Sequence, residues 1–275
     1  MKILFYTNGQ KQAQEVVVFG AELFKYIQPQ VTLLSMVEKM ESSPQPKPEE
    51  LKIATGLLKD RGIKAKTKIR EGDVAEEILK ESREGNYDLL VIGSRGYSDI
   101  LIGLSEVVLD ETVQHVISRV ETSLLVGKEP RSLQKVLICT DGSDQAEKAI
   151  SFFVSLKLDR KIQINIMNVI PEIYSRFKDF LEPVDENQLE LLGSLPSKRT
   201  EFLYKAKEML ADHGLEARIK LREGNAAEEI LKEAENNYDL VVMGFGGRKR
   251  IKKNTIGRQT MLVMMQAKIP VLCIK

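Results

Sequence analysis

Residues 222–247 contain the sequence "REGNAAEEILKEAENNYDLVVMGFGG". Its first part has apolar residues at helical spacing, and its second part is an apolar run that ends among glycines. This order predicts a helix, a short turn and a buried strand that carries a glycine loop. Residues 70–96, "REGDVAEEILKESREGNYDLLVIGSRG", have the same order and many of the same letters. The chain therefore contains this segment twice.

The repeat continues on both sides of these segments, in the same order. The other matching pairs are "KILFYTNG" (2–9) with "KVLICTDG" (135–142), "VTLLSMV" (31–37) with "INIMNVI" (164–170), and "TSLLVGK" (122–128) with "IPVLCIK" (269–275). A period of about 130–140 residues has the size of a whole domain and is too long for a solenoid. We predict two domains, 1–129 and 134–275, joined near "GKEPRSLQ" (127–134).

Apolar strands alternate with amphipathic helices in each unit. The expected strands are 3–7, 31–37, 64–69, 89–92 and 122–128 in the first half and 136–140, 164–170, 216–221, 240–243 and 269–275 in the second. Helices are expected between them, among others at 49–61 and 197–213. Buried strands separated by helices predict an α/β fold with two tandem, doubly wound parallel sheets. Such sheets bind ligands at the carboxyl ends of their strands, where the strand order reverses.

The composition is that of a soluble globular protein. The 275 residues are 43% hydrophobic and 29% charged, with a formal net charge of +1. A balanced charge gives no general attraction for a polyanion, so nucleic-acid binding is not expected. Cys139 and Cys273 lie in apolar runs and are expected to be buried and reduced. Apolar runs are too short for a signal peptide or a membrane span, which predicts a cytoplasmic protein.

Residues 244–260, "GFGGRKRIKKNTIGRQT", follow the strand of the second half. Gly244 and Gly247 allow a sharp backbone turn and a close approach to a ligand. After nine intervening residues, Gly257 precedes a predicted helix whose N-terminal amides can hold a phosphate. Asp141 ends another strand, where its carboxylate can accept a ribose hydroxyl, and Ser143 or Asp144 is expected to cap the next helix. A doubly wound sheet would bring these pieces together.

Other features leave alternatives open. The basic run 248–253 fits a solvated loop, a phosphate or partner contact, or, least well, nucleic acid. The insertion 171–196 is either a lid over the site or a helix packed on the sheet. His115 and His213 are expected at the surface, without a metal or a nucleophile beside them. The acidic residues of the two "AEEILKE" helices are expected to form a solvent face.

As a set, these motifs resemble the universal stress protein family. The resemblance rests on "CTDGSDQAEKAI", on the strand "DLVVMG" with its glycines, on the nine-residue spacing to Gly257 and on "AKIPVLCIK", and it covers the whole chain as two copies. It implies five-stranded parallel sheets of the adenine nucleotide alpha hydrolase-like type. It also implies a role in the stress response and ATP or another adenine nucleotide as ligand, with Mg²⁺ as an optional companion. Family members commonly dimerise through their last strands, so "SLLVGK" and "PVLCIK" are expected to pair within the chain as an internal pseudo-dimer.

The resemblance also assigns site residues. The base would contact Cys139 and Val169, and Asp141 would take the ribose or the adenine edge. The ribose and phosphates would lie against Met243, Gly244, Gly246 and Gly247, and the distal phosphates against Gly257 and the amides of Arg258 and Gln259. Arg258 departs from the family pattern, which has Ser or Thr there. A guanidinium can bind phosphate through two hydrogen bonds, or it can point to solvent.

The first half has lost much of this pattern. Asn8 replaces Asp141, and Asp110 and Glu111 stand where Gly257 and its neighbour stand. Two carboxylates would repel a phosphate, so we predict that only the second half binds a nucleotide.

Three functions remain open. The first is a non-enzymatic, nucleotide-binding regulator of the stress response that acts on an unidentified protein partner. The second is an enzyme, at most a slow ATPase, although the chain has no P-loop lysine motif and no evident general base. The third is a nucleotide-free scaffold for protein contacts. Whether two chains form a homodimer is left open.

Overall fold

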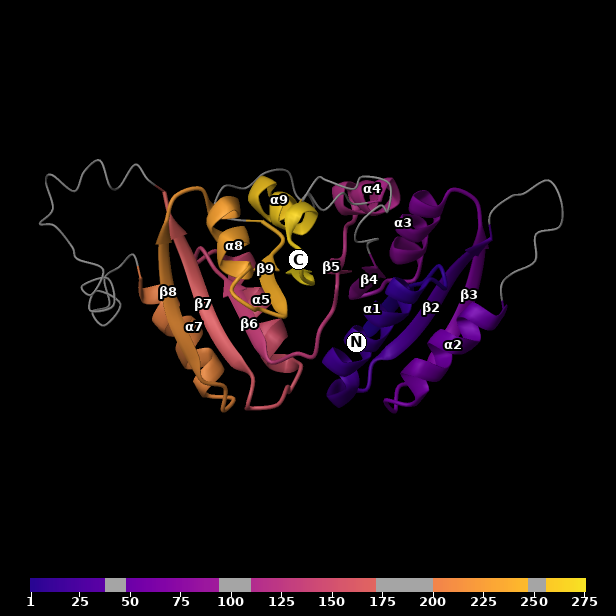
Figure 1. Cartoon of the computed structure of the whole chain (residues 1–275), viewed down its shortest axis with the longest axis horizontal. Helices are drawn as coiled ribbons and strands as arrows, with labels where there is room; N and C mark the ends of the chain where they lie inside the picture. The colour runs from indigo at the N-terminus through magenta and orange to yellow at the C-terminus, as the bar shows by residue number, and fades with distance from the viewer. Residues whose placement is uncertain (38–47, 94–109, 172–199, 247–255) are drawn as a thin grey trace, which may run out of the picture.

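The computed structural model describes residues 1–37, 48–93, 110–171, 200–246 and 256–275 (Figure 1). The first half contains β1 (Lys2–Tyr6), α1 (Lys11–Phe24), η1 (Lys25–Ile27), β2 (Gln30–Val37), α2 (Pro48–Lys59), β3 (Ala65–Glu71), α3 (Val74–Glu84), β4 (Leu89–Gly93), α4 (Glu111–Arg119) and β5 (Ser123–Gly127). The second half contains β6 (Lys135–Cys139), α5 (Asp144–Ser155), β7 (Gln163–Ile170), α7 (Glu201–Ala211), β8 (Ala217–Glu223), α8 (Ala226–Ala234), β9 (Leu240–Gly244), α9 (Arg258–Gln266) and β10 (Val271–Ile274). The expected strands and helices are present, and those whose ends are described differ from the expected ranges by a few residues.

All ten strands form one sheet in the order β3-β2-β1-β4-β5-β10-β9-β6-β7-β8. Each half is a parallel five-stranded sheet with the doubly wound order, which confirms the predicted fold class. The strand order reverses between β1 and β4 in the first half and between β6 and β9 in the second. Ligand crevices of such sheets open at these points, beyond the carboxyl ends of the strands.

The two halves join through their last strands. β5 and β10 pair antiparallel, with Leu125 opposite Leu272 and Val126 opposite Val271. This is the internal pairing that was expected from the resemblance. Because the seam is antiparallel, the carboxyl ends of the second-half strands lie on the same side of the sheet as the amino ends of the first-half strands.

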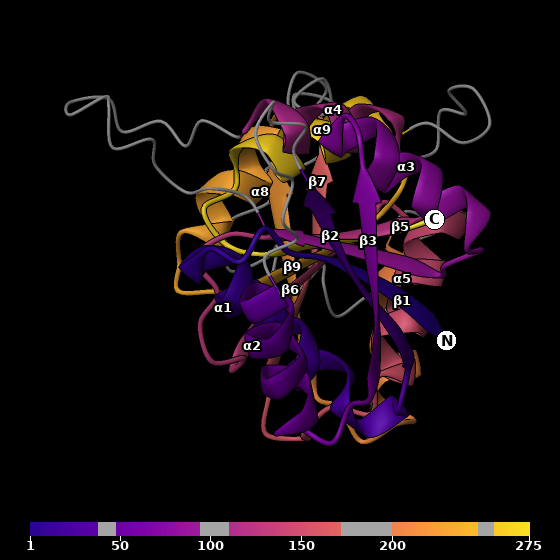
Figure 2. The ribbon, with the colours of Figure 1, turned by 90° about the vertical axis from the view of Figure 1, so that its right-hand side faces the viewer.

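Helices cover both faces of this sheet (Figures 1 and 2). α1, α2, α5 and α7 pack on one face, around a core that includes Phe5, Phe24 and Phe153. The second face carries α3, α4, α8 and α9, around a core that includes Tyr238 and Met264. Each half therefore contributes to two apolar layers that run across the seam.

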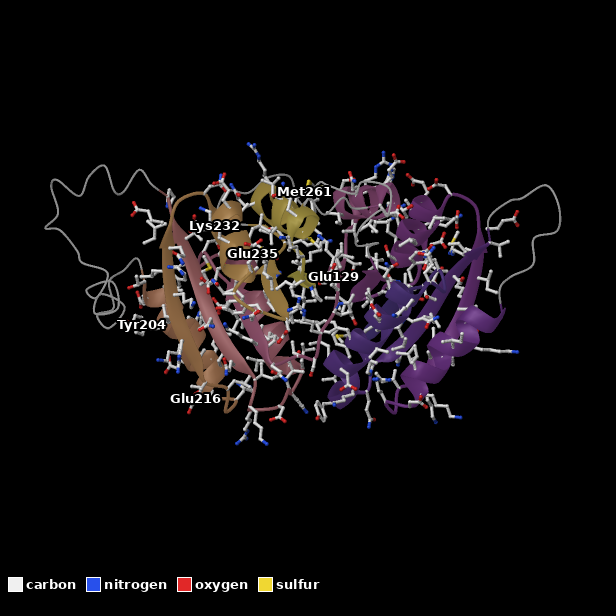
Figure 3. All side chains as sticks on the ribbon, in the orientation of Figure 1. Glu129, Tyr204, Glu216, Lys232, Glu235 and Met261 are labelled. Carbon is white, nitrogen blue, oxygen red and sulfur yellow. The ribbon has the colours of Figure 1, made fainter. Side chains whose placement is uncertain are left out.

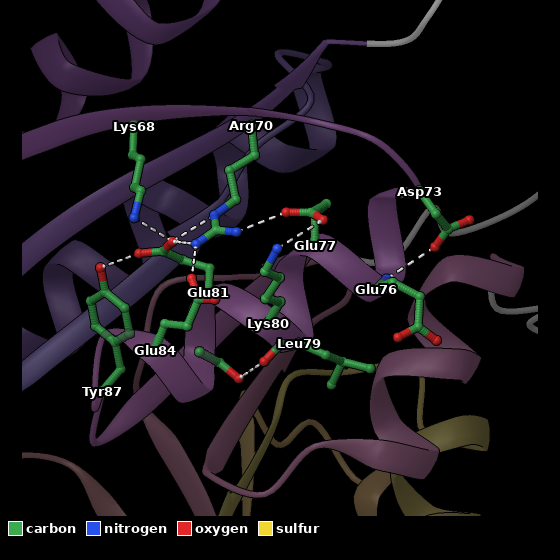
Figure 4. A network of polar contacts seen from close by, with 11 residues as sticks. Lys68, Arg70, Asp73, Glu76, Glu77, Leu79, Lys80, Glu81, Glu84 and Tyr87 are labelled. Carbon is green, nitrogen blue, oxygen red and sulfur yellow. Dashed lines mark hydrogen bonds and ion pairs between the residues drawn. The ribbon is translucent and has the colours of Figure 1, made fainter.

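One expectation about the helices is wrong. Glu76 and Glu228 do face solvent, but Glu81 on α3 and Glu233 on α8 are buried, each 1% exposed. Basic side chains from the adjacent edge strands reach them. Glu81 pairs with Lys68 and Arg70 of β3 (Figure 4), and Glu233 pairs in the same way with β8.

Tyrosine hydroxyls complete both buried pairs. Tyr87 donates to Glu81 at 3.0 Å, and Tyr238 donates to Glu233 at 2.8 Å. Burial alone would raise the pKa of Glu233, but hydrogen bonds from Lys220, Arg222 and Tyr238 outweigh it and hold this pKa at about 2. For Glu81 the same balance lowers the pKa. Both carboxylates stay ionised and fasten their helices to the edge strands.

Candidate functional site

A cavity of about 1540 Å³ opens at the point where the strand order of the second half reverses. Nine of the ten predicted site residues line it: Cys139, Asp141, Val169, Met243, Gly244, Gly246, Gly257, Arg258 and Gln259. The tenth, Gly247, lies outside the described residues, as do the basic run 248–253 and the insertion 172–196. The strand ends that the sequence predicted to meet do meet here. Their contact with a ligand stays a prediction.

The turn after β6 holds Asp141 at the cavity wall. The Oδ1 atom of Asp141 accepts a hydrogen bond from the Ser143 amide at 3.0 Å, and the Oγ1 atom of Thr140 accepts one from the Gly142 amide at 3.1 Å. Gly142 has φ +76, which favours glycine at this turn. As predicted, Ser143 then caps α5, accepting from the Ala146 amide.

The glycines after β9 have two different roles. A Cβ atom on Gly244 would lie 2.7 Å from the carbonyl carbon of Gln145, in the first turn of α5. Gly244 is therefore required for the packing of strand against helix, in addition to any approach of a ligand. A Cβ atom on Gly246 would meet no atom of the described residues within 4 Å. Because Gly246 lines the cavity, this open space belongs to the candidate site.

α9 begins at the same cavity. Its N-cap residue is Gly257, and among the described residues no side chain caps its first amides. The amides of Arg258 and Gln259 precede the first intrahelical bond, which Met261 donates to the Gly257 carbonyl at 2.8 Å. Unpaired amides at the positive end of a helix dipole are a general anion site. The side chain of Arg258 is exposed and also lines the cavity.

Two contacts hold this end of α9 against the end of β9, and a third joins it to α8. The Gly257 amide donates to the Phe245 carbonyl at 2.7 Å, and the Oγ1 atom of Thr260 donates to the Gly244 carbonyl at 3.2 Å. The side chain of Gln259 accepts from the Ala227 amide of α8 at 3.1 Å. This bond occupies the Oε1 atom of Gln259 and leaves its Nε2 donors and its backbone amide for a ligand, and the role of that amide stays a prediction.

The far wall of the cavity is formed by β6 and β7. Cys139 is 7% exposed, and burial together with the charge of Glu233 raises the pKa of its thiol, which stays protonated. The side chain of Asn168 donates to the Thr140 carbonyl at 2.8 Å and so ties the two strand ends together. This wall offers a neutral surface of sulfur, methyl and backbone groups, including Val169.

Sequence reasoning missed several polar residues of the cavity wall. Asn168 is one of them. Gln145 is another, and its Oε1 atom is buried with no hydrogen-bond partner among the described residues. A buried polar atom without a partner is costly, and a bound group with a donor would satisfy it. The signal was present, because Gln145 lies in the first helical turn, directly after the turn that carries Asp141.

The first half repeats the turn but not the open helix end. Asn8 accepts from the Gln10 amide at 3.2 Å, as Asp141 does from Ser143. Asp110, however, is the N-cap of α4, and its carboxylate accepts from the Thr112 amide at 2.8 Å. The position that corresponds to Gly257 is thus filled by an anion from the chain itself. Gly96, Gly103 and Ser105 lie outside the described residues.

Neither histidine lies in the cavity, and no metal site or membrane-spanning helix is found among the described residues. His115 lies 2.9 Å from Glu76, and the Nδ1 atom of His213 lies 3.0 Å from the Met209 carbonyl. Across the described ranges, acidic, histidine and cysteine side chains form no group suited to a metal ion. No described helix has the length and apolar character needed to cross a bilayer.

Comparison with known proteins agrees with the repeat. The model of the universal stress protein family matches residues 1–128 and again residues 132–275. Universal stress protein Slr1230 of Synechocystis sp. is 24% identical over 278 residues, which cover 99% of this chain and 88% of that protein. Universal stress protein YxiE of Bacillus subtilis is 28% identical over 145 residues, which cover 51% of this chain and 98% of that protein.

Solved structures agree at the level of the fold. A universal stress protein from Archaeoglobus fulgidus superposes with a TM-score of 0.68 at 19% identity, covering 100% of this chain and 98% of that one. The family model matches almost every residue, in two consecutive copies. The chain therefore belongs to the universal stress protein family, with two family units in tandem.

Proposed function

We propose that the second half binds one adenine nucleotide per chain and that the protein is a non-enzymatic, nucleotide-responsive regulator of the stress response. One observation carries the proposal: the N-terminus of α9, which no described side chain caps, and Gly246, which no described atom crowds, face the same cavity. An uncapped helix end is suited to phosphate, and a glycine without neighbours leaves room for it.

The nucleoside would occupy the wall formed by β6 and β7. The neutral surface at Cys139 and Val169 suits a flat, apolar base, and Met243 of β9 would border the ribose. The carboxylate of Asp141 is already oriented by the Ser143 amide and would accept a hydrogen bond from a ribose hydroxyl. The unpartnered Oε1 atom of Gln145 is a second acceptor on the same wall.

The phosphates would lie between the two glycine segments. Gly244, Gly246 and Gly247 would border one side, and Gly257 with the amides of Arg258 and Gln259 the other. The guanidinium of Arg258 is a further phosphate partner, in place of the hydroxyl found in the family pattern. A Mg²⁺ ion would enter with the phosphates and keep part of its water shell.

The experiment is a calorimetric titration with ATP, ADP and AMP, with and without Mg²⁺. We expect one site per chain, because Asp110 occupies the helix end of the first half. Two equivalent sites per chain would contradict the proposal, and so would the absence of binding by all three nucleotides.

The two halves supply a matched pair of variants. Asp141→Ala and Asn8→Ala both remove a side-chain bond to the turn amide two residues further on, at 3.0 and 3.2 Å. Their effects on folding should therefore be similar, while only Asp141→Ala should weaken nucleotide binding. Equal nucleotide affinities for the two variants would show that Asp141 does not contact the nucleotide.

Two other functions are tested by the same material. Slow ATP hydrolysis that disappears in Asp141→Ala would favour a weak ATPase. A protein that purifies without nucleotide, and whose melting temperature no adenine nucleotide changes, would favour a scaffold that acts only through a protein partner.

A further inference from the structure

Lys128 is a buried charge at the seam between the halves. It follows β5 directly and is only 1% exposed. Its Nζ atom donates to the carbonyls of Met264, at 2.7 Å, and Met265, at 2.9 Å. Both carbonyls belong to α9, so a residue of the first half holds a helix of the second. Figure 3 places the next residue, Glu129, at the middle of the molecule.

The end of α9 is the partner of this charge. Lys128 forms no ion pair with a described carboxylate, and burial lowers the pKa of its amine to about 7. The last carbonyls of a helix have no intrahelical donors and form the negative end of its dipole. An ammonium group placed there satisfies two of these carbonyls and interacts favourably with the dipole.

The opposite end of α9 is the proposed phosphate site. α9 has nine residues, so Met265 and the amide of Arg258 are roughly 10 Å apart along the axis. A helix this short moves as one piece. Release of its C-terminal end would therefore shift the amides at its N-terminal end relative to Gly246. α9 also packs on α4, a second contact with the first half.

The repeat provides a natural comparison. Lys275 is the counterpart of Lys128, because each lysine ends its copy of the last strand motif. The Nζ atom of Lys275 donates to the carbonyl of Glu121, just beyond α4. This contact is exposed. Glu121 follows α4, whose N-terminus is capped by Asp110. The two lysines thus form reciprocal contacts across the seam, but only that of Lys128 leads to an open helix end.

We propose that Lys128 is a positioning residue through which the first half sets the phosphate affinity of the second-half site. The proposal rests on the proposed nucleotide site. It holds that Lys128 keeps α9 in the position at which its first amides face the cavity. Contacts to the nucleoside, which lie on β6 and β7, do not depend on Lys128.

The test compares ATP with adenosine in titrations of the whole protein. Lys128→Met fills a similar volume and removes the charge and both hydrogen bonds. We expect it to bind ATP about tenfold more weakly and adenosine within about twofold of the wild type. Lys128→Arg, which keeps donors for both carbonyls, should retain the wild-type ratio of ATP to adenosine affinity. Lys275 lines the same cavity, so Lys275→Met serves as the matched control only for the exchange measurement.

Equal losses for ATP and adenosine would indicate general destabilisation and would overturn the proposal, and so would an unchanged ATP affinity. Hydrogen exchange of the α9 amides is a second measurement that needs no ligand. Faster exchange at α9 in Lys128→Met, but not in Lys275→Met, supports the anchoring role, and unchanged exchange refutes it. If the wild type binds neither ligand, the proposed function fails while the exchange experiment still decides the role of Lys128.

Discussion

The substitution Gly244→Ala should destabilise the protein through a backbone contact. The new methyl group would lie 2.7 Å from the carbonyl carbon of Gln145 and 2.8 Å from the amide nitrogen of Ala146. Ordinary contact begins near 3.4 Å, so strand and helix would have to separate by about 0.7 Å. Neither atom belongs to a flexible side chain. α5 would have to withdraw from β9 along its first turn.

That withdrawal would disturb a closely packed layer. Ala149 and Phe153 of α5 are 0% and 1% exposed and lie in the core beneath the sheet. Overpacking of this kind costs about 1–3 kcal/mol of the free energy of unfolding. We expect a loss in this range in urea unfolding followed by circular dichroism. Nucleotide binding should weaken too, because α5 begins at the cavity.

Gly246→Ala is the matched control, two residues along the same loop. Its methyl group would meet no atom within 4 Å in the part of the chain that the structure describes, and the φ angle of Gly246 is not positive. Its free energy of unfolding should stay within about 0.5 kcal/mol of the wild type. Nucleotide affinity should fall, since the methyl group would enter the proposed phosphate path. Equal stability losses in the two variants, or no loss in Gly244→Ala, would refute the assignment of separate roles.

Three further predictions concern charges and thiols. The folded pKa of Glu233 lies at about 2, below the usual 4.5, so its stabilising contribution is complete above pH 4.5 and is lost as the pH falls toward 2. Glu233→Gln should lower the free energy of unfolding by about 3 kcal/mol at pH 7 and by little near pH 2, as measured by urea unfolding. An equal loss at both pH values would argue against the buried ion pair. Asp110→Ala should lower the free energy of unfolding by about 1 kcal/mol, measured in the same way, because it removes the cap of α4. Cys139 and Cys273 should resist a thiol reagent until the protein unfolds, because burial raises both pKa values, and rapid labelling of the native protein would contradict this.

The repeat made most of the fold predictable. Two copies of each motif showed which apolar runs were strands, and the nine-residue spacing to Gly257 located the start of α9. The seam followed from the resemblance, since the last strand motifs of the two copies were expected to pair. Local patterns were sufficient here because the elements carry their own periodicity, and α3, α4, α5 and α8 also have side-chain N-caps.

The contacts between elements were harder to predict. Glu81 and Glu233 seemed to belong to a solvent face, because acidic residues on an amphipathic helix usually do. Their burial depends on basic residues of the preceding edge strands, such as Arg70 and Lys220. The pattern was visible in both copies as two basic residues spaced by two, but only the packing of strand against helix shows which carboxylate they reach. The same holds for Lys128, whose partners lie 136 and 137 residues away.

The first half departs from the family pattern in one feature and keeps another. Asp110 caps its helix α4 where the second half has Gly257, yet β5 still covers the outer edge of β10. Without β5, the backbone groups of β10 would be unpaired at a sheet edge, and Leu272 and Cys273, both 0% exposed, would lose their cover. The first half therefore pairs the edge strand of the second half, and its residue Lys128 donates hydrogen bonds to the C-terminal end of α9. A duplicated unit can lose its own site and still be retained when the intact site is built against it.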